Sequence, residues 1–422
     1  MKFTELGLNE TLLEAISFMN FEEATEIQEK AIPKILEGKD LIGCAQTGTG
    51  KTAAFILPTL HQVIKNKSTG TSVLVLVPTR ELAIQIDQQI QGLAYFTETS
   101  SMAIFGGADG ISWEQERRAL SEGSDVIIAT PGRLIGHLNN GYVKFDKVAH
   151  LILDEADRML DIGFHDDLVK IISFLPKKRQ SLLFSATMAP KIRVLAKEIL
   201  KDPFEINISV SKPAEGVSQH VFLAHEEQKA AITKGILKDK DAYQSIIIFC
   251  ATRKKVEQLS RKLKNWSFNC RGISSDYGQE ERTQTLLDFK SRNLRILVAT
   301  DVMSRGIDIK DINLVINYDV PGDAEDYVHR IGRTARASTK GMAITLVNEE
   351  EMYKFHRIEK LIERVLDKEQ PPEHLGPGPV WKVEEKRRSG KKKFAGKKKF
   401  FNKNKAKSNN ASRKPRPKGP SQ

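Results

Sequence analysis

Residues 45–52 read Ala-Gln-Thr-Gly-Thr-Gly-Lys-Thr, and their types and order suit the binding of phosphates. Gly48 and Gly50 allow backbone N–H groups to approach a phosphate closely, and a helix that starts after them favours negative charge. We expect the Lys51 ammonium to meet the β- and γ-phosphates of a nucleotide, and the Thr52 hydroxyl to bind Mg²⁺. The segment therefore predicts a loop that binds a nucleoside triphosphate.

The residues around this loop support that interpretation. A strand-like run at 40–44 precedes it and an apolar helical pattern at 53–57 follows it, which is the strand–loop–helix order that such sites need. Ala45 stands where loops of this kind usually begin with glycine. The alternative, a glycine-rich turn with an incidental lysine, leaves the flanking elements without a role.

A second cluster, Asp154-Glu155-Ala156-Asp157, follows the short apolar run Leu151–Leu153. Carboxylates at the end of a buried strand, beside a phosphate loop, are placed to hold Mg²⁺. Asp154 is the candidate metal ligand, and Glu155 is the candidate for orienting or deprotonating an attacking water. For this segment alone, an acidic helix N-terminus is the alternative, but the neighbouring phosphate loop favours catalysis.

Short β-branched runs, each followed by turn residues and a helical pattern, must position these groups. The runs are continuously apolar, which is typical of parallel strands buried on both faces and predicts an α/β fold. The expected strands are 72–77, 125–129, 151–153 and 181–184 in the first half and 245–249, 295–299, 314–317 and 342–347 in the second. The polar segment 208–219 shows no helical pattern. We expect it to link a first domain, 1–207, to a second, 220–366.

The formal net charge of +12 is concentrated in the last part of the chain. Residues 386–422 contain 16 Lys or Arg and no Asp or Glu, which leaves the rest of the chain at −4. After residue 366 the strand and helix patterns stop, and a composition of Lys, Arg, Asn, Ser, Gly and Pro cannot offset its ordering entropy. We expect residues 367–422 to form a disordered Lys/Arg-rich tail.

The three cysteines suggest a reducing compartment. Cys44, Cys250 and Cys270 form no Cys-x-x-Cys pair, and packing is the simplest role for each thiol. No apolar run approaches the length of a membrane span. These features predict a soluble cytoplasmic protein with no membrane partner.

The phosphate loop and the acidic segment belong to a longer ordered set of motifs. The other members are PTRELA at 78–83, GG at 106–107, TPGR at 130–133, SAT at 185–187, IIIFCAT at 246–252, QxxR at 279–282, ATD through RGID at 299–308 and HRIGRTAR at 329–336. Together these motifs resemble the DEAD-box family of superfamily 2 helicases over about residues 1–366. The resemblance implies two tandem RecA-like parallel-sheet domains that close on ATP and RNA.

ATP is the implied nucleotide. Phe21 and Gln28 match the family's Q motif, in which a Gln amide both donates to and accepts from the adenine edge while an aromatic ring packs beside the base. Asn20 and Ala24 stand where the family has Gly and Pro. The expected ATP-binding residues are Phe21, Gln28, Ala45, Gln46, Thr47, Gly48, Thr49, Gly50, Lys51, Thr52 and Asp308.

In the second half, Arg333 and Arg336 resemble the family's arginine fingers, which approach the γ-phosphate and stabilise its developing charge. His329 is implied to join the water network near Glu155, and Asp308 to contact the ribose. A surface ion pair is the alternative for either arginine. The implied catalytic residues are Lys51, Asp154, Glu155, His329, Arg333 and Arg336.

RNA is the implied substrate, through contacts to phosphates, sugars and 2′-hydroxyls that carry no base sequence. The implied RNA-binding residues are Thr79, Arg80, Thr130, Gly132, Arg133, Arg253, Arg282 and Thr300. Ser185 and Thr187 are implied to couple the ATP site to domain closure. Ala335 and the pair Ser274-Ser275 depart from the family pattern, which has Gly and His-Gly there.

The resemblance predicts an ATP-dependent RNA helicase that couples hydrolysis to local, non-processive unwinding or remodelling of RNA duplexes and ribonucleoproteins. An RNA chaperone or annealing protein and an ATP-gated RNA clamp are the alternatives. Lysine clusters at 391–393 and 397–399, each followed by phenylalanine, predict salt-sensitive RNA tethering by the tail. A solubilising or localisation role is the other interpretation of the tail. Protein partners from ribosome assembly or RNA decay fit this activity.

Overall fold

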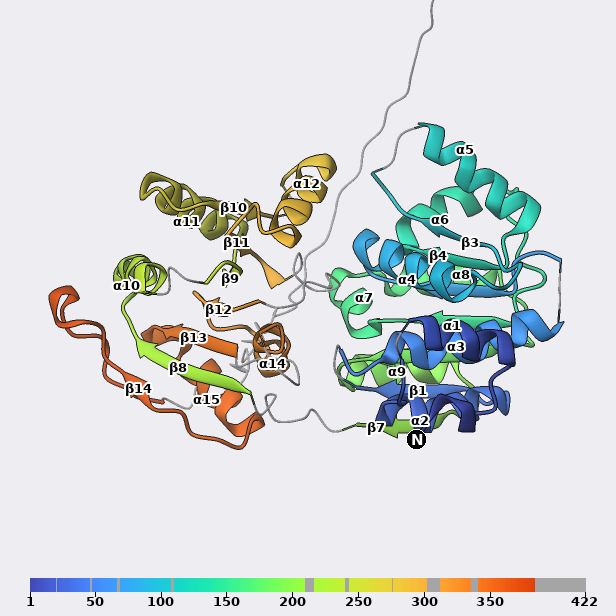
Figure 1. Ribbon diagram of the computed structural model, residues 1–422, viewed down its shortest axis with the longest axis horizontal. Helices are drawn as coiled ribbons and strands as arrows, with labels where there is room; N and C mark the ends of the chain where they lie inside the picture. The colour runs from blue at the N-terminus through green and yellow to red at the C-terminus, as the bar shows by residue number, and fades with distance from the viewer. Residues whose placement is uncertain are drawn as a thin grey trace, which may run out of the picture. The chain divides into compact units, whose positions relative to one another are not determined.

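The computed structural model describes residues 1–19, 21–45, 48–66, 69–107, 110–208, 216–239, 243–274, 276–301, 312–334 and 341–383. The described chain contains two separate seven-stranded sheets, each covered by helices (Figure 1). Every pair of neighbouring strands in both sheets is parallel. The α/β fold with parallel sheets that the continuous apolar runs predict is therefore confirmed.

The first sheet has the strand order β3-β4-β2-β5-β6-β1-β7. Its strands are β1 Leu41–Cys44, β2 Val73–Leu76, β3 Ser101–Ile104, β4 Val126–Ala129, β5 His150–Leu153, β6 Gln180–Ser185 and β7 Phe204–Asn207. Its helices are α1 Glu10–Phe18, α2 Glu26–Leu36, α3 Lys51–Asn66, α4 Arg80–Leu93, α5 Gly110–Arg118, α6 Pro131–Leu138, α7 Ala156–Ile162, α8 His165–Ser173 and α9 Pro190–Ile199. Two short helical turns, η1 Phe3–Glu5 and η2 Ala119–Gly123, complete this part of the chain.

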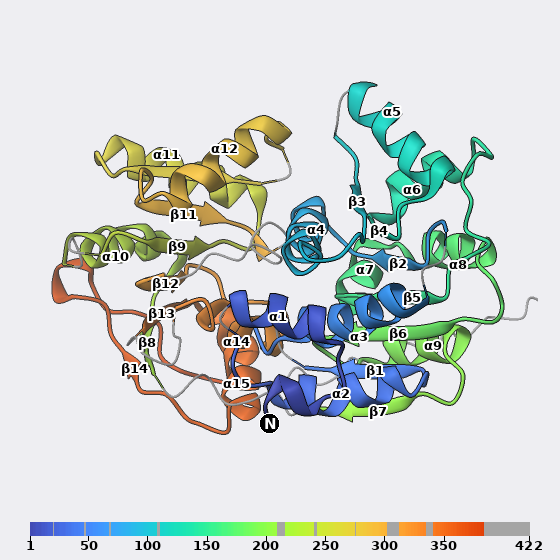
Figure 2. The ribbon, with the colours of Figure 1, turned by 45° about the vertical axis from the view of Figure 1, so that its right-hand side comes forward.

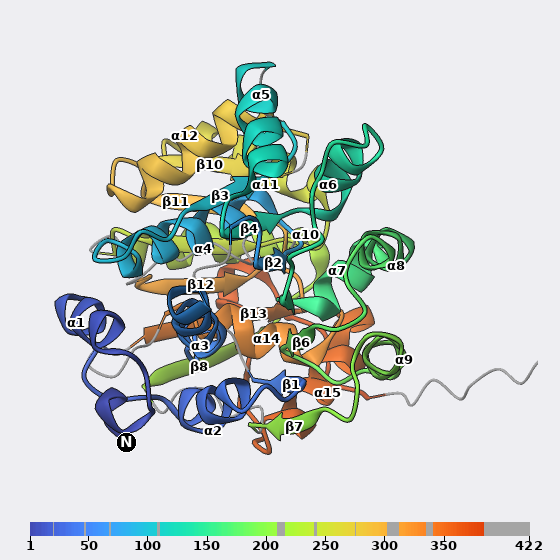
Figure 3. The same cartoon turned by 90° about the vertical axis from the view of Figure 1, so that its right-hand side faces the viewer.

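Successive strand residues point to opposite faces of this sheet, so each strand contributes to two cores. Val73 and Val75 pack with helices α1 to α4, whereas Leu74 and Leu76 pack with α6 to α9. Figure 3 shows these two groups of helices on the two sides of the strands. The double burial explains why the strands are continuously apolar, since a strand with one solvated face would alternate.

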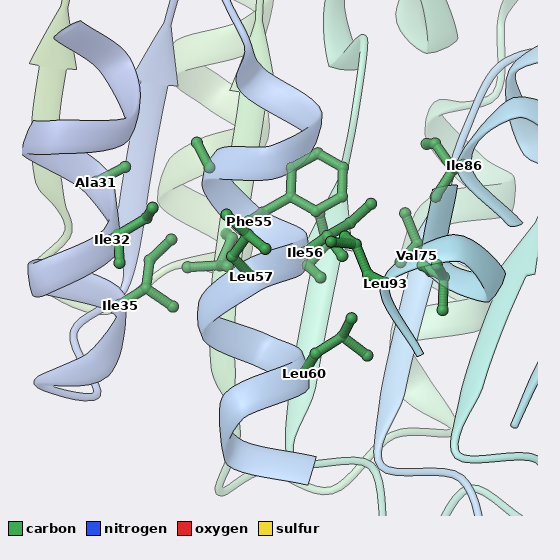
Figure 4. Packing of buried hydrophobic residues seen from close by; sticks show 14 of the residues in the cluster. Ala31, Ile32, Ile35, Phe55, Ile56, Leu57, Leu60, Val75, Ile86 and Leu93 are labelled. Atoms are coloured by element: carbon green, nitrogen blue, oxygen red, sulfur yellow. The ribbon is translucent and has the colours of Figure 1, made fainter. Parts of the chain in front are cut away.

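The core between the sheet and helices α2 to α4 is densely apolar (Figure 4). Ile32 and Ile35 of α2, Phe55 of α3 and Ile86 of α4 are all fully buried. The rings of Phe55 and Phe184 pack with their centroids 5.2 Å apart. Burying a side chain of this size contributes about 1.5–3 kcal/mol, so this core anchors the first turn of α3, where the phosphate loop ends.

The second sheet repeats the arrangement, with the strand order β10-β11-β9-β12-β13-β8-β14. Its strands are β8 Val217–Leu223, β9 Ile246–Phe249, β10 Cys270–Ile273, β11 Ile296–Ala299, β12 Leu314–Asn317, β13 Gly341–Val347 and β14 Lys368–Glu369. Its helices are α10 Glu226–Asp239, α11 Arg253–Asn265, α12 Gln279–Lys290, α14 Ala324–Ile331 and α15 Met352–Leu361, with turns η3 Glu349–Glu351 and η4 Glu373–Leu375. Helices α10 and α11 cover one face, and α12, α14 and α15 cover the other. Helices α14 and α15 lie side by side (Figure 2).

Two boundaries differ from those expected. Strand β8 begins at Val217, so the last residues of the segment expected as a linker, 208–219, form part of the second sheet. The tail expected from residue 367 begins later, because the compact unit extends to Val383. Strand β14 pairs with β8, and the Trp381 ring packs against Phe355 with centroids 6.2 Å apart. Trp381, which lies among prolines and glycines, thus packs against the core of the second domain. The composition of this segment does not reveal that contact.

The remaining basic segment, 384–422, lies outside the described residues. Within the described parts of the chain, no helix combines the length and the apolar character that crossing a membrane requires.

Candidate functional site

The phosphate loop connects β1 to α3 and carries the conformation that its glycines predict. Gly48 and Gly50 have φ values of 89° and 91°, in the left-handed region that other residues adopt only at a cost of about 1–2 kcal/mol. Gly50 is further constrained by space, because a Cβ atom there would lie 2.4 Å from the Gln28 Nε2 atom. The Lys51 Nζ atom, which is buried, donates a hydrogen bond to the Ala45 carbonyl at 2.7 Å. Lys51 is therefore held at the mouth of the loop.

The other expected loop residues fall into two groups. Thr49 and Thr52 are half-buried, with Thr52 in the first turn of α3. Gln46 and Thr47 lie outside the described residues.

The acidic segment begins directly after β5 and faces the same sheet edge as the loop. The Asp154 Oδ1 atom accepts a hydrogen bond from the Glu155 backbone N–H at 2.9 Å, and the side chain is 3% exposed. Burial raises the pKa of the Asp154 carboxyl to about 7, and the Lys51 ammonium opposes that rise. The two groups that sequence reasoning assigned to phosphate and to Mg²⁺ are thus electrostatically coupled.

Glu155 has an unusual backbone. Its φ of 49° and ψ of 48° place it in the left-handed region at the N-terminus of α7, and such strain costs about 1–3 kcal/mol and clusters at functional sites. The Glu155 carboxylate lies 3.3 Å from the Arg158 Nη1 atom. Sequence reasoning missed Arg158, although its position one turn into the helix, three residues after Glu155, was a signal.

Ser185 links the acidic segment to the phosphate loop. Strand β6, which ends at Ser185, lies between β1 and β5 in the sheet. The Ser185 carbonyl accepts a hydrogen bond from the Ala45 N–H at 3.1 Å. The Ser185 hydroxyl donates to the Thr187 carbonyl at 2.8 Å and accepts from the Thr187 N–H at 3.3 Å. The coupling role of the two residues stays a prediction; Ser185 adjoins the loop, and Thr187 is bonded to Ser185.

Gln28 connects the N-terminal motif to the loop. Its Oε1 atom accepts from the Thr25 N–H at 2.9 Å, and its Nε2 atom donates to the Gly50 carbonyl at 3.1 Å. A glutamine amide has two donor hydrogens and two acceptor lone pairs, so these bonds use half of its capacity. The Phe21 ring is 42% exposed and lies 6.4 Å from the buried Phe3 ring. Adenine reading by Gln28 and Phe21 stays a prediction.

Two expected RNA-binding motifs lie at the starts of helices on adjacent strands. Thr79 follows β2 and caps α4 by accepting from the Leu82 N–H at 3.4 Å, and Thr130 is the N-cap of α6 after β4. The Arg80 guanidinium lies over the Phe105 ring at 4.5 Å. Arg133 donates from Nε to Glu116 at 2.7 Å, and Gly132 beside it is exposed.

The RNA-binding candidates of the second half are in varied surroundings. Arg253 forms an exposed ion pair with Asp276, and Thr300 is buried. The Arg282 Nη2 atom donates to the Glu81 carboxylate at 2.8 Å. Arg253 and Arg282 thus both form ion pairs with carboxylates, and their contact with RNA stays a prediction.

The candidate catalytic residues of the second half lie at the end of α14. The His329 Nδ1 atom is 3.9 Å from the Asp326 carboxylate, and Arg333 follows the helix and is half-buried. Asp308, Arg336 and Ala335 lie outside the described residues. The roles of His329 and Arg333 therefore stay predictions.

Arg330 is a site residue that sequence reasoning missed. Its Nε and Nη2 atoms donate to the two carboxylate oxygens of Asp301 at 2.6 and 2.7 Å. Its Nη1 atom donates to the Asn317 side chain at 3.0 Å and to the Asp319 carbonyl at 2.8 Å. This buried guanidinium ties α14, which precedes Arg333, to the residue that follows Thr300. The position of Arg330 inside the HRIGRTAR motif was the only sequence feature that indicated a role at the site.

The donor atoms at the first sheet edge fit a hard divalent cation. The Thr52 hydroxyl and the Asp154 carboxylate are oxygen donors, which Mg²⁺ prefers, and Mg²⁺ usually takes only one or two protein ligands beside phosphates and water. Among the described residues, no group of three or more His, Cys, Asp or Glu is placed to hold a metal ion.

One parallel sheet carries the phosphate loop and the acidic segment at its carboxyl edge, where Lys51 and Asp154 are electrostatically coupled. A second parallel sheet follows, with an arginine at the end of one of its helices. Together these features define a two-domain nucleotide-dependent helicase. Residues 25–195 match the family model of the DEAD/DEAH box helicases, and residues 228–338 match that of the helicase conserved C-terminal domain.

Relatives and solved structures agree on the family. The chain is 43% identical to the ATP-dependent RNA helicase CshA of Listeria monocytogenes over 372 residues, which are 88% of this chain and 71% of that protein. It is 41% identical to the DEAD-box ATP-dependent RNA helicase CshA of Geobacillus kaustophilus over 88% of this chain and 78% of the relative. Yeast Dbp5 bound to RNA and ADP BeF3 superposes with a TM-score of 0.78 at 31% identity, covering 87% and 95% of the two chains. The chain belongs to the DEAD-box family of ATP-dependent RNA helicases.

Membership confirms the two RecA-like domains and the activity that the motifs predict. The protein is an RNA-dependent ATPase that binds ATP and RNA and acts as an ATP-dependent RNA helicase. A structure of Mss116p bound to single-stranded RNA and AMP-PNP shares the same arrangement of elements, with a TM-score of 0.77 at 30% identity over 88% of this chain and 80% of that one.

Proposed function

We propose that this helicase separates short RNA duplexes locally, by gripping one strand while ATP is bound and releasing it after hydrolysis. The observation that carries the proposal is the common sheet edge. The phosphate loop follows β1, Asp154 follows β5, and the Arg80 and Arg133 motifs follow β2 and β4 of the same parallel sheet. The carboxyl ends of parallel strands meet at one edge, so changes at the nucleotide have a short path to the RNA contacts.

In this proposal each chemical role belongs to a named side chain. Lys51 and the loop N–H groups hold the phosphates, and Glu155 orients the attacking water. Mg²⁺, held by Thr52 and Asp154, would supply neutralising charge at the β- and γ-phosphates. Arg333 and Arg336 stabilise the charge that develops on the γ-phosphoryl group.

The RNA contacts in this proposal do not read base sequence. Helix N-termini at Thr79 and Thr130 present N–H groups that suit phosphates, and guanidinium groups suit them bidentately. Bending of the gripped strand would break continuous duplex geometry, so strand separation would follow from binding rather than from translocation.

The basic residues of the segment 386–422 are proposed to tether RNA near this core. Their charge of +16 contrasts with −4 for the rest of the chain, and counterion release gives such segments salt-sensitive affinity for any RNA. A cytoplasmic location is proposed as well, supported by the three free cysteines, which suit a reducing compartment. Ribosome-assembly and RNA-decay proteins are the proposed partners.

The test compares ATP turnover with and without single-stranded RNA, in wild type and in Arg333→Ala. Stimulation by RNA in wild type and its loss in Arg333→Ala would support the proposal. Equal turnover with and without RNA would contradict it. Stimulated turnover without strand separation would instead favour an annealing protein or an ATP-gated clamp.

A further inference from the structure

Helix α5 carries a carboxylate on its buried side that the catalytic account does not use. Glu116 is 3% exposed, whereas its neighbours Glu114, Arg117 and Arg118 lie on the exposed side of the helix. A buried carboxylate is costly unless its hydrogen bonds and its charge are both satisfied. The partners of Glu116 therefore indicate which role this buried carboxylate has.

Those partners are Arg133 and His137 of α6. One oxygen of Glu116, Oε2, lies 2.7 Å from the Arg133 Nε atom and 2.7 Å from the His137 Nε2 atom. The other ring nitrogen of His137 contacts the Tyr142 hydroxyl. His137 is itself fully buried, so the carboxylate has a rigid anchor on one side and the arginine on the other.

Trp113, one turn before Glu116 on α5, fixes the remaining freedom of this group. Its ring stacks on His137 with centroids 3.8 Å apart and planes 15° apart. The Arg133 guanidinium carbon lies 4.4 Å from the same ring. The guanidinium is thus held at one edge by the carboxylate and across its plane by the indole, which is the pair of contacts that suits arginine and not lysine.

This arrangement leaves the terminal nitrogens of Arg133 for another ligand. Its bond to Glu116 uses Nε, and Nη2 is buried with no hydrogen-bond partner among the residues that the structure describes. The Arg133 side chain remains 16% exposed, so a phosphate that reaches the guanidinium would also give the Nη2 atom the partner that it lacks, in the bidentate geometry that suits phosphate oxygens. Arg133 also lies in the first turn of α6, where the helix favours negative charge.

We propose that Glu116, Trp113 and His137 are positioning residues that aim Arg133 at a phosphate of the bound RNA strand. The inference rests on the proposed RNA contact of Arg133. The inference predicts that the affinity of the protein for RNA depends on the Glu116 carboxylate. This group does not touch RNA, and its negative charge would repel the phosphates.

The sign of that dependence separates positioning from simple electrostatics. If only net charge near the RNA mattered, removing the Glu116 carboxylate would tighten binding, since one negative charge fewer would face the phosphates. If Glu116 positions Arg133, removing it frees the guanidinium to adopt other rotamers and binding weakens. A charge-assisted hydrogen bond of this kind corresponds to about tenfold or more in an equilibrium constant.

The experiment is a double-mutant cycle on the full chain, read as the concentration of single-stranded RNA that gives half-maximal ATPase stimulation. The variants are Arg133→Ala, Glu116→Leu and the combination of the two. We expect Glu116→Leu to raise the half-maximal concentration about tenfold, and to add little once Arg133 is absent. The effect should fall on this concentration more than on turnover at saturating RNA.

Two further variants separate positioning from damage to the fold. Glu116→Gln keeps the shape and one acceptor oxygen, so it should recover part of the lost affinity. Glu114→Gln removes a carboxylate from the exposed side of the same helix, where Glu114 pairs with Arg117 at 2.6 Å, and should leave the half-maximal concentration unchanged. Thermal unfolding of each variant reports whether α5 and α6 remain packed.

Unchanged or tighter RNA binding in Glu116→Leu, with Arg133→Ala still weakened, would overturn the inference and leave the proposed function standing. Additive effects of the two substitutions would overturn it in the same way. If Arg133→Ala binds RNA like wild type, the proposed RNA contact fails and the inference fails with it. If RNA does not stimulate the wild type at all, the fault lies in the proposed function.

Discussion

Replacing Asp154 by Asn is expected to stabilise the nucleotide-free first domain at neutral pH while it removes ATP turnover. Asp154 is buried, and burial raises its pKa from the ordinary 3.8 to about 7. Because the folded-state pKa is raised, the full stability is present below the unfolded pKa and is lost as the pH rises through the folded pKa. This rise in the pKa of Asp154 corresponds to a loss in the free energy of unfolding of about 4 kcal/mol above pH 7 and about 2 kcal/mol near pH 5. Asn carries no charge and escapes this loss.

The assay is chemical unfolding of wild type and Asp154→Asn in EDTA without nucleotide, at about pH 5 and about pH 8. Hydrogen exchange in β5 and β6 makes the measurement specific for this domain. The advantage of the variant should grow by about 2 kcal/mol between the two conditions, and added Mg²⁺ and ATP should stabilise wild type more than the variant. An advantage of equal size at both pH values would refute an electrostatic origin.

Three other substitutions and one deletion test separate parts of the account. Lys51→Ala should weaken ATP binding, whereas Glu155→Gln should bind ATP and RNA but stall hydrolysis. Nucleotide titration measures the ATP affinity, and an equal affinity in Lys51→Ala and wild type would count against the loop assignment. Lys229→Met should destabilise the second domain by about 3–5 kcal/mol, because this fully buried ammonium lies within 3.4 Å of three carboxylates. Chemical unfolding measures the loss of stability, and a loss below about 1 kcal/mol would contradict the expected cost of an unpaired buried charge. Deleting residues 384–422 should flatten the salt dependence of RNA binding and spare turnover at saturating RNA; an unchanged salt slope would assign the tail another role.

The sequence predicted the parts of the fold that depend on local pattern. Continuous apolar runs located β2, β4, β5 and β6 and their counterparts in the second half, because central strands of a doubly covered sheet must be apolar throughout. It did not predict β3, β7, β10 or β14, which lie at the sheet edges, and it also missed β8, whose first residues were expected in the linker. An edge strand has fewer neighbours to bury it, as the largely exposed β7 illustrates, so its pattern resembles that of a loop.

The site was predictable where chemistry is encoded by adjacent residues, and not where it depends on long-range pairing. The phosphate loop and the acidic segment are each continuous, and the structure brings Lys51 and Asp154 to one edge. The pairing of Arg330 with Asp301 spans 29 positions and that of Arg133 with Glu116 spans 17. No local periodicity marks such partners, because only the packing of separate elements brings them together.

The central claim is that ATP binding and hydrolysis at the first-domain site drive local separation of RNA strands. Its most direct measurement is the release of a labelled strand from a short RNA duplex with a single-stranded extension, in the presence of ATP, ADP or no nucleotide. We expect release with ATP in wild type, little release with ADP, and little release with ATP in Lys51→Ala. Strand release that is equally fast without nucleotide, or undiminished in Lys51→Ala, would contradict the account.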